Sequence, residues 1–346
     1  MRHLSRNVKL SSLGLSIDLT DFNLKDIITK NKFTLYNQEI SPYIVKSIAE
    51  ENIRKQLAND VDVYSELSWF SERQKYGYLL MRNCFSTDKL PPTPCNDEAP
   101  DASLWIEPAS TLMAMLGVTG HTVSSYLNEM QGRLAHMVMP AKNNEKSWSR
   151  STKSLSPHTE VVNGHWSEML PDDTRNQVIA PEVFALACLR NPIQAATTVW
   201  SLDDILNNLS YSTIEQLMKP EYIASSQSSF DVDSKIENIS VIGDINGRLV
   251  IRYSHSKLVG INDEANEALE KLKTHLSDPK YINRVVLQPG DVLIINNRIA
   301  LHGRDNLSSS ANYDGNDRWL IRMYGFSHNS WKKLKHLPEK QHIASA

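Results

Sequence analysis

Cysteine is scarce in this 346-residue chain, which contains only Cys84, Cys95 and Cys188 and no Cys-x-x-Cys pair. Three irregularly spaced cysteines do not suit a disulfide framework or a cysteine-based metal site, so we expect a reducing, cytoplasmic environment. Residues 1–15 include basic residues but lack the apolar segment of a signal peptide. No apolar run approaches the length that crosses a bilayer, so we expect no membrane partner.

An excess of charge of either sign is also absent. The chain has 37 Lys and Arg against 40 Asp and Glu, a formal net charge of −3, and its basic residues are dispersed. Proteins that bind nucleic acid concentrate basic residues on one face, so we expect no nucleic-acid partner. The length fits one large domain with insertions, or two modest domains.

Short strands with turn signals dominate the second half of the chain. Asn246-Gly247 between two β-prone segments indicates a hairpin, residues 289–291 (Pro-Gly-Asp) form a tight turn between strands, and residues 319–326 indicate another strand. Residues 109–116 and 263–276 instead have helical patterns. We predict a mixed α/β fold with a mainly β core, a double-stranded β-helix (jelly roll) with flanking helices.

The predicted organisation has three parts. Residues 1–130 would form a helical or mixed buttress, residues 131–330 the jelly-roll catalytic core, and residues 331–346 a C-terminal tail. Within the core, residues 141–157 are polar and rich in Ser, Lys and Asn, which indicates a lid loop, and residues 263–277 indicate an inserted helix.

Two distant segments provide a candidate metal site. His158 and Glu160 are two residues apart, so on an extended segment their side chains point the same way. His302 follows a turn and a buried strand, which would place it at the mouth of a barrel. Singly, each pattern is common and is more often structural. Together, two His and one carboxylate form the facial triad of non-heme Fe(II) oxygenases, which leaves the opposite face of the metal open.

Two arginines on one later strand are the next candidates. Arg318, Leu320 and Arg322 alternate along a predicted strand and would share its inward face. A buried arginine needs an anionic partner, and a dicarboxylate co-substrate would provide one. The simpler interpretation of either arginine is a surface salt bridge.

Five motifs in order then resemble one family. They are His-Thr-Glu at 158–160, Leu-Arg-Asn-Pro at 189–192 with a following Thr-Thr, Pro-Gly-Asp at 289–291, His-Gly-Arg at 302–304, and Asp-Gly-x-Asp-Arg-Trp-Leu-x-Arg at 314–322. From about residue 156 to 326 the chain resembles the clavaminate-synthase-like branch of the Fe(II)/2-oxoglutarate oxygenases, which is related to taurine dioxygenase. This branch includes hydroxylases of arginine, asparagine and lysine.

The resemblance implies roles for individual residues. His158, Glu160 and His302 would bind Fe(II). Arg318 and Thr198 would bind the distal carboxylate of 2-oxoglutarate, and O₂ would complete the co-substrates. Arg322 matches the position that holds the α-carboxylate of the substrate, and Gln131 would lie near its α-amino group. The implied activity is hydroxylation of an unactivated C–H bond of a free amino acid or close derivative, in specialised metabolism such as antibiotic biosynthesis.

One departure from the family pattern concerns the substrate. Arginine hydroxylases of this branch carry an Asp-x-Asp pair before the long helix, where residues 253–256 here are Tyr-Ser-His-Ser. Serine cannot neutralise a guanidinium, so the sequence argues against arginine, and less strongly against lysine.

Three other functions remain open at this point. The same chemistry, as hydroxylation or desaturation, could act on a carrier-bound or peptidyl amino acid, with a carrier protein as partner. A non-catalytic jelly-roll binding protein would use the same His and Glu structurally. A zinc hydrolase could also use two His and one Glu, but would leave Arg318 without a role.

Overall fold

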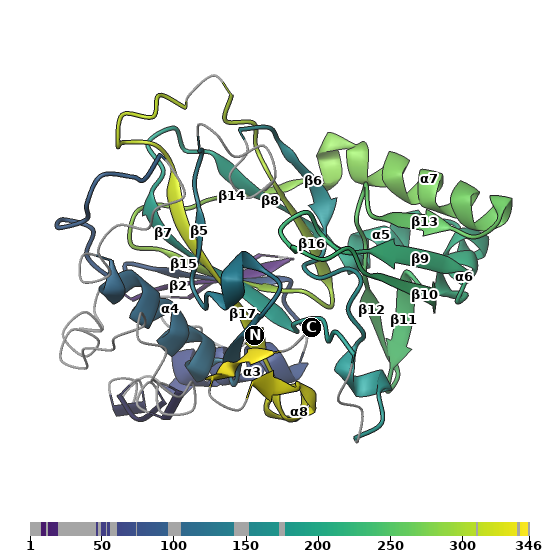
Figure 1. Ribbon diagram of the computed structural model, residues 1–346, viewed down its shortest axis with the longest axis horizontal. Helices are drawn as coiled ribbons and strands as arrows, with labels where there is room; N and C mark the ends of the chain where they lie inside the picture. The colour runs from purple at the N-terminus through teal and green to yellow at the C-terminus, as the bar shows by residue number, and fades with distance from the viewer. Residues whose placement is uncertain are drawn as a thin grey trace.

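A computed structural model of the chain is shown in Figure 1. It describes residues 8–11, 13–19, 46–47, 50–52, 54–55, 61–73, 75–95, 105–141, 152–172, 177–308, 311–337 and 340–344. The predicted lid at 141–157 lies mostly outside these ranges, because residues 142–151 are not among them. No helix of the described part is both long enough and apolar enough to cross a membrane.

A large mixed sheet forms the centre of the molecule. In the described part of the chain its ten strands have the order β1-β2-β3-β15-β7-β17-β4-β19-β18, with β5 paired beside β17. The strands are β1 (Val8–Leu10), β2 (Gly14–Asp18), β3 (Tyr78–Arg82), β4 (Thr122–Tyr126), β5 (His136–Val138), β7 (Val183–Arg190), β15 (Val292–Asn296), β17 (Trp319–Phe326), β18 (His336–Leu337) and β19 (Lys340–Ala344).

The central strands of this sheet are covered on both faces. β7 is buried along almost its whole length, and its side chains alternate between two separate apolar clusters. Ala185 and Ala187 belong to the cluster that includes α4 (Ile106–Val118), whereas Phe184 and Leu186 belong to the cluster shared with a second sheet. Two-sided burial explains why β7 has a continuous apolar sequence rather than an alternating one.

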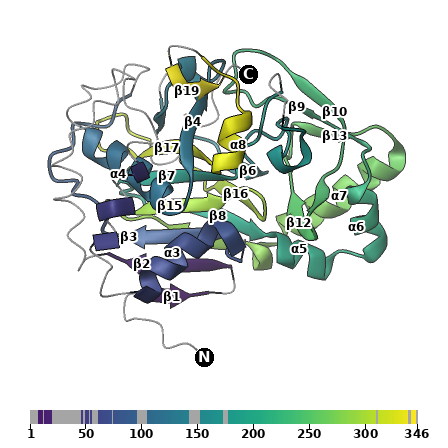
Figure 2. The same ribbon diagram turned by 90° about the horizontal axis from the view of Figure 1, so that it is seen from below.

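Helices close one face of the large sheet. α4 is apolar around its circumference, with buried residues from Pro108 to Val118, as expected of a helix inside a core. α3 (Val61–Arg73) contributes Val63, Leu67 and Phe70 to the same cluster. Figure 2 shows β1, β2 and β3 at one edge of the sheet with α3 beside them. Residues before position 130 therefore extend the sheet directly.

A second, four-stranded sheet lies against the other face. Its order is β14-β8-β16-β6, all antiparallel. The strands are β6 (Leu155–His158), β8 (Ala196–Ser201), β14 (Asn283–Val286) and β16 (Ala300–Arg304). The second apolar cluster contains side chains of both sheets, including Leu186 and Leu293 from the large sheet and Val199 and Val285 from the small one. The two sheets thus share one core.

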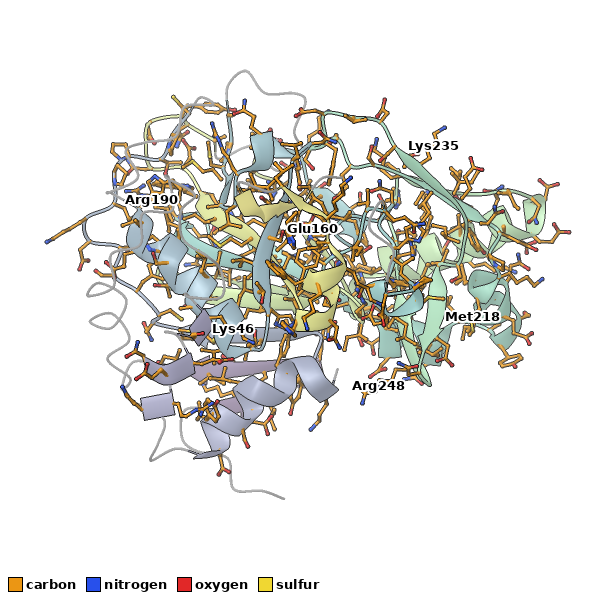
Figure 3. All side chains as sticks on the ribbon, turned by 60° about the horizontal axis from the view of Figure 1, so that its bottom comes forward. Lys46, Glu160, Arg190, Met218, Lys235 and Arg248 are labelled. Atoms are coloured by element: carbon orange, nitrogen blue, oxygen red, sulfur yellow. The ribbon has the colours of Figure 1, made fainter. Side chains whose placement is uncertain are left out.

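An insertion between β8 and β14 forms a compact lobe with its own apolar cluster, and it lies to the right in Figure 1. It contains α5 (Leu202–Asn208), α6 (Tyr211–Met218), β9 (Tyr222–Ser225), β10 (Lys235–Ile239), β11 (Ile242–Ile245), β12 (Arg248–Ile251), β13 (Leu258–Gly260) and α7 (Asp263–Ser277). In Figure 3 Met218, Lys235 and Arg248 lie on this lobe, whereas Glu160 lies at the middle of the molecule.

Several sequence predictions are confirmed by these elements. The inserted helix spans residues 263–277 as predicted, and Asn262 caps it by accepting a hydrogen bond from the Ala265 amide. The strand at 319–326 is β17, and the hairpin at Asn246-Gly247 joins β11 to β12. The mixed α/β class is confirmed as well. The C-terminal residues are more than a tail, because β19 pairs in parallel with β4 after α8 (His328–Lys333).

Candidate active site

A cavity of about 320 Å³ opens between the two sheets. The large sheet contributes side chains of β5, β7 and β17, and the small sheet contributes residues of β6, β8 and β16. The inserted lobe closes one side with residues 227–229 and 254–257. This volume is in the range of pockets that bind small molecules. Arg318, Leu320 and Arg322 all line the cavity, so the prediction that they share an inward face is confirmed.

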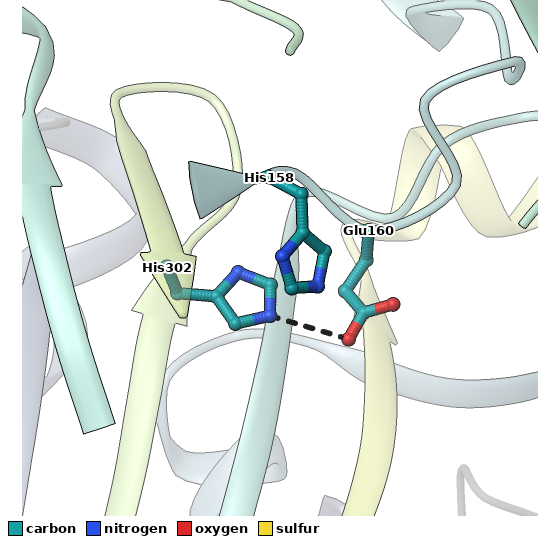
Figure 4. A group of neighbouring side chains, drawn as sticks. All are labelled: His158, Glu160 and His302. Atoms are coloured by element: carbon teal, nitrogen blue, oxygen red, sulfur yellow. Dashed lines mark ion pairs between the residues drawn. The ribbon is translucent and has the colours of Figure 1, made fainter. Parts of the chain in front are cut away.

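His158, Glu160 and His302 meet at the wall of this cavity. His158 ends β6, Glu160 follows in the next turn, and His302 lies on β16 directly opposite His158 in the strand register. One nitrogen or oxygen of each residue lies within 4.8 Å of the other two, and the two imidazole centroids are 4.1 Å apart. Figure 4 shows the three side chains converging on one point. Strand pairing therefore brings together His158 and His302, which are 144 positions apart in the chain.

Neighbouring groups hold each of these three residues in place. Ser156 O accepts a 2.8 Å hydrogen bond from His158 Nδ1, so Nε2 of His158 faces the convergence point. Asn297 fixes the backbone of Glu160, since its Oδ1 accepts from the Glu160 amide at 2.8 Å and its Nδ2 donates to the Glu160 carbonyl at 3.0 Å. His302 Nε2 lies 3.5 Å from Glu160 Oε1. Fixed orientation of this kind is typical of metal ligands.

The electrostatics of the three residues suit a cation. Burial and the neighbouring His302 lower the pKa of His158 to about 4. Burial alone would raise the pKa of Glu160, but Arg322 and the two imidazoles hold it well below its usual range. The site thus presents a carboxylate beside an uncharged imidazole at neutral pH. Two imidazoles and one carboxylate are the donor set that non-heme Fe(II) takes, so the residues present fit that metal.

Glu160 receives three further hydrogen bonds that the sequence did not reveal. Arg322 Nη1 donates to its Oε1 at 2.9 Å, while Gln227 Nε2 and Tyr324 Oη donate to its Oε2 at 3.1 and 3.2 Å. Gln227 also accepts from the Val161 amide at 2.8 Å. Gln227 belongs to the inserted lobe, and no local pattern in the sequence connects it to a residue 67 positions away.

Arg318 is a buried cation with unpaired donors. It is 3% exposed, and its Nε and Nη1 have no hydrogen-bond partner in the described part of the chain. Burial lowers its pKa to about 10, although Cys188 and Asp305 raise it. An arginine that keeps its charge at neutral pH and has no partner for two donors is suited to an anionic ligand in the cavity.

The prediction for Thr198 needs correction. β8 pairs with β16 so that Thr197 lies opposite Arg304 and Thr198 opposite Gly303. Directly opposed residues project to the same face, and Arg304 and Thr197 both line the cavity. The hydroxyl of Thr198 instead lies under Gly303, near Trp200. Because side chains alternate along a strand, Thr197 is the residue available to a ligand.

The prediction for Gln131 is also wrong in position. Met130 and Gln131 have φ angles of +50° and +60°, and this left-handed turn leaves the Gln131 side chain exposed and outside the cavity lining. Glu129, two residues earlier, is fully buried. No turn motif in the sequence predicts this tight turn. The turn determines that Glu129 is buried and Gln131 is exposed.

Glu129 and Arg322 form the centre of a buried polar network. Arg322 Nη2 donates to Glu129 Oε1 at 2.7 Å and lies 2.9 Å from His136 Nδ1. The Tyr324 hydroxyl lies between the two carboxylates, 3.0 Å from Glu129 Oε1 and 3.2 Å from Glu160 Oε2, and its one proton can be donated to either. Burial raises the pKa of Glu129, Arg322 opposes this, and Glu160 adds to it. Glu129 Oε2 has no hydrogen-bond partner in the described residues. A buried carboxylate oxygen without a partner can accept from a ligand's ammonium group.

Comparison with known proteins places the chain in a family. The model of the family "Taurine catabolism dioxygenase TauD, TfdA family" matches residues 140–324. The chain therefore belongs to the TauD/TfdA family of dioxygenases, which depend on iron, 2-oxoglutarate and O₂. The matched residues include the three convergent side chains and the cavity-lining Arg318 and Arg322.

Two of the proteins that the chain resembles are named for the amino acids lysine and asparagine. The chain is 24% identical to L-lysine 3-hydroxylase of Catenulispora acidiphila, over 75% of this chain and 69% of that protein. It is 29% identical to clavaminate synthase 2 of Streptomyces clavuligerus, over 72% and 73%. Among solved structures, asparagine oxygenase with Fe(II), 2S,3S-3-hydroxyasparagine and succinate has the same fold, with a TM-score of 0.77 and 23% identity over 96% of this chain and 99% of that one.

Proposed function

We propose that this protein is an Fe(II)/2-oxoglutarate-dependent dioxygenase that hydroxylates an unactivated C–H bond of a free amino acid or close derivative. The observation that carries the proposal is the convergence of His158, Glu160 and His302 within 4.8 Å, beside the unpaired buried donors of Arg318. His158, Glu160 and His302 would hold Fe(II). Bound iron with 2-oxoglutarate and O₂ supplies the oxidation R–H + 2-oxoglutarate + O₂ → R–OH + succinate + CO₂.

Arg318 and Thr197 are the proposed contacts of 2-oxoglutarate. The guanidinium of Arg318 has unpaired donors at Nε and Nη1, so its charge and its N–H groups are available to the distal carboxylate. Thr197 lines the cavity on β8 and offers a hydroxyl on the same wall. Between them these groups would orient the dicarboxylate toward the three iron ligands.

Arg322 and Glu129 are the proposed contacts of the substrate's amino-acid group. Arg322 lines the cavity and would bind the α-carboxylate, the role that the family resemblance implies for it. Glu129 does not itself line the cavity, but its carboxylate is bonded to Arg322, which does, and its free Oε2 would accept from the α-ammonium group in place of Gln131. A cation beside a carboxylate matches a zwitterion, because each substrate charge meets an opposite one.

A tethered substrate is the second candidate within the same chemistry. An amino acid held by a carrier protein as a thioester has no free α-carboxylate, and Arg322 would then have no anion to bind. The cavity position of Arg322 therefore favours a free small-molecule substrate. The named relatives favour it too, since lysine and hydroxyasparagine are free amino acids.

We also propose that the two facing sheets form the double-stranded β-helix, or jelly roll, that the sequence predicts. Residues 131–330 would be its catalytic core and residues 1–130 its buttress, whereas β19 of the predicted C-terminal tail joins the large sheet. The antiparallel strand pairs β7–β17 and β8–β16 that face each other across the cavity support this arrangement. Residues 141–154 remain the proposed lid, because residues 155–157 at the end of the predicted range belong to β6.

The proposed function is tested by succinate formation. The protein would be given Fe(II), 2-oxoglutarate and O₂ with each of a panel of free amino acids, and succinate and hydroxylated product would be quantified. We expect one amino acid, or a few related ones, to raise succinate formation well above the substrate-free rate, with equimolar product. Absence of stimulation by any free amino acid would move the proposal to a tethered substrate. Absence of all succinate would contradict the oxygenase itself.

A further inference from the structure

One wall of the cavity comes entirely from the inserted lobe. It consists of residues 227–229, which follow β9, and residues 254–257, which precede β13, and it is called the distal wall below. β9 and β13 pair side by side, and the amide of Ser225 donates to the carbonyl of Lys257 at 2.8 Å, so the two segments form one surface. Figure 1 shows β9 and β13 side by side in the inserted lobe.

The distal wall begins at the proposed iron ligands. Ser254 forms an isolated β-bridge with His158, and Gln227 Nε2 donates to Glu160 Oε2 at 3.1 Å. From Ser254 a short turn leads to Lys257, three residues further along, a span of about 10 Å at most. A side chain of an amino acid oxidised at the iron would therefore extend along this wall toward Lys257.

The wall carries positive charge and free hydroxyls, with no acid of its own. The carboxylate that lines the described cavity is Glu160, and Arg322, Gln227 and Tyr324 already donate to it. The ammonium group of half-buried Lys257 forms no hydrogen bond or ion pair with a described residue.

The hydroxyls of the wall are equally available. Those of Ser228, Ser254 and Ser256 form no hydrogen bond with a described residue. Each can donate to an oxygen of a ligand, so the wall offers one charge and three donors.

We infer that the substrate is an amino acid with an acidic side chain, whose distal carboxylate lies against Lys257 and the serine hydroxyls of the distal wall. The inference rests on the proposed function, because it takes the α-groups to be held by Arg322 and Glu129. A cationic side chain in this position would face an ammonium group with no carboxylate to compensate, so lysine, ornithine and arginine are disfavoured. An amide side chain would fit by shape but would leave Lys257 without its counter-charge.

Equilibrium binding tests the inference without relying on turnover. The protein loaded with Fe(II) and 2-oxoglutarate under anaerobic conditions would be titrated calorimetrically with aspartate, glutamate, their amides, and lysine, ornithine and arginine. We expect aspartate or glutamate to bind at least about tenfold more tightly than its own amide, and more tightly still than the three cationic amino acids. Cationic or amide ligands that bind as tightly as the acids would overturn the inference, and so would binding of none.

Variants of Lys257 identify the charge responsible. Lys257→Met should weaken binding of the acidic ligand about tenfold and change binding of the amide by no more than about threefold, while Lys257→Glu should reverse the preference between acidic and cationic ligands. Lys271→Met is the matched control, because Lys271 lies on the exposed face of α7 and pairs with Glu267. Equal effects of Lys257→Met on acid and amide would overturn the assignment of Lys257.

The two proposals fail in different ways. Selective binding of an acidic amino acid without succinate formation on admission of O₂ would contradict the proposed hydroxylation and keep the substrate inference. Succinate formation with lysine or arginine, matched by tight binding of the same compound, would keep the oxygenase and contradict the acidic substrate.

Discussion

Arg318 and Arg322 are four residues apart on one strand face, yet their surroundings differ. Arg322 is bonded to two carboxylates, which raise its pKa against the effect of burial. Arg318 lacks partners for Nε and Nη1, and burial lowers its pKa to about 10. Arg322 is therefore part of a preorganised network and keeps one unpaired donor, Nε, for the substrate's carboxylate, whereas Arg318 has no carboxylate partner among the described residues and is available to 2-oxoglutarate.

This difference predicts separable kinetic effects. Arg318→Met should raise the KM for 2-oxoglutarate at least about tenfold and leave the KM for the amino acid nearly unchanged, because the lost contact is with the co-substrate. Arg322→Lys should mainly raise the KM for the amino acid, since lysine keeps the charge but loses the bidentate fork. Steady-state kinetics with each substrate varied in turn would decide. Identical changes in both variants would contradict the division of roles.

His302 offers a residue-scale test of the iron site. Its Nδ1 has no hydrogen-bond partner in the described part of the chain, so His302→Ala removes a ligand without breaking a hydrogen bond at that atom. We expect loss of Fe(II) binding and of turnover with little change in the circular dichroism spectrum. His165→Ala is a suitable control, because His165 lies outside the cavity lining. Normal Fe(II) binding by His302→Ala would refute the assignment.

His121 predicts a pH dependence of stability. Burial, together with the charges of Lys46 and Arg298, lowers its pKa from the ordinary 6.5 to about 3. The unfolded chain therefore binds a proton that the folded chain does not, so this contribution is fully present above about pH 6.5 and is lost as the pH falls toward 3. The slope from this group is at most about 1.4 kcal/mol per pH unit. Chemical denaturation between pH 7 and 5 should show a shallower decline for His121→Gln than for the exposed-site variant His328→Gln.

At the scale of elements, the pairing of β6 with β16 determines whether the site forms. His158 and His302 are opposite each other only in this register, and Gly303 allows the close approach because a Cβ atom there would overlap the Leu155 carbonyl. Whether the position of a site residue depends on such long-range register explains whether it could be predicted from the sequence. Spacing along one strand is visible in a sequence, so His158, Glu160 and the inward face of β17 were predictable.

Other positions depended on pairing or on turns that the sequence does not encode locally. The register of β8 against β16 determines that Thr197 faces inward, so the prediction of Thr198 was wrong by one residue. The exposed position of Gln131 follows from two consecutive left-handed residues. Gln227 touches Glu160 only because the inserted lobe folds over the site. Tyr324 touches it because β17 of the large sheet lies beside the segment that carries Glu160.

Gly303→Ala tests the element-scale argument. The added methyl group should push β6 away from β16, cost about 1–3 kcal/mol of stability, and weaken Fe(II) binding because His158 moves with β6. Gly247→Ala, which has a positive φ but open space around its Cβ, should lose stability through backbone strain and keep its affinity for Fe(II). Thermal unfolding and metal titration of both variants would separate the effects. Equal Fe(II) affinities would count against the register argument.

At the scale of the whole molecule, the two ends of the described chain complete the large sheet around the site. β2 extends the sheet beside β3, and β19 pairs with β4. Ile343 of β19 is 1% exposed and packs on Gly132, at the turn that orients Glu129. The C-terminal strand therefore supports a proposed substrate contact more than 200 residues earlier in the chain.

Ile343→Ala should accordingly destabilise the protein by about 2–5 kcal/mol, the usual cost of emptying a buried aliphatic site. It should also raise the KM for the amino acid, because the turn that carries Glu129 loses its packing. Leu127→Ala, at a residue 41% exposed on the same edge, is the control and should do neither. A destabilised Ile343→Ala enzyme with an unchanged KM would show that the strand stabilises the fold alone.

The assignment of His158, Glu160 and His302 as the iron site is tested most directly by an anaerobic titration of the protein with Fe(II) and then 2-oxoglutarate. The readout is the visible charge-transfer absorption of the Fe(II)–2-oxoglutarate chelate. We expect one Fe(II) per chain and a band that appears only when both Fe(II) and 2-oxoglutarate are present. His302→Ala should lack the band, and Arg318→Met should require more 2-oxoglutarate to reach it. A protein that binds no Fe(II), or a band that persists in His302→Ala, would contradict the assignment of His158, Glu160 and His302 as the iron site.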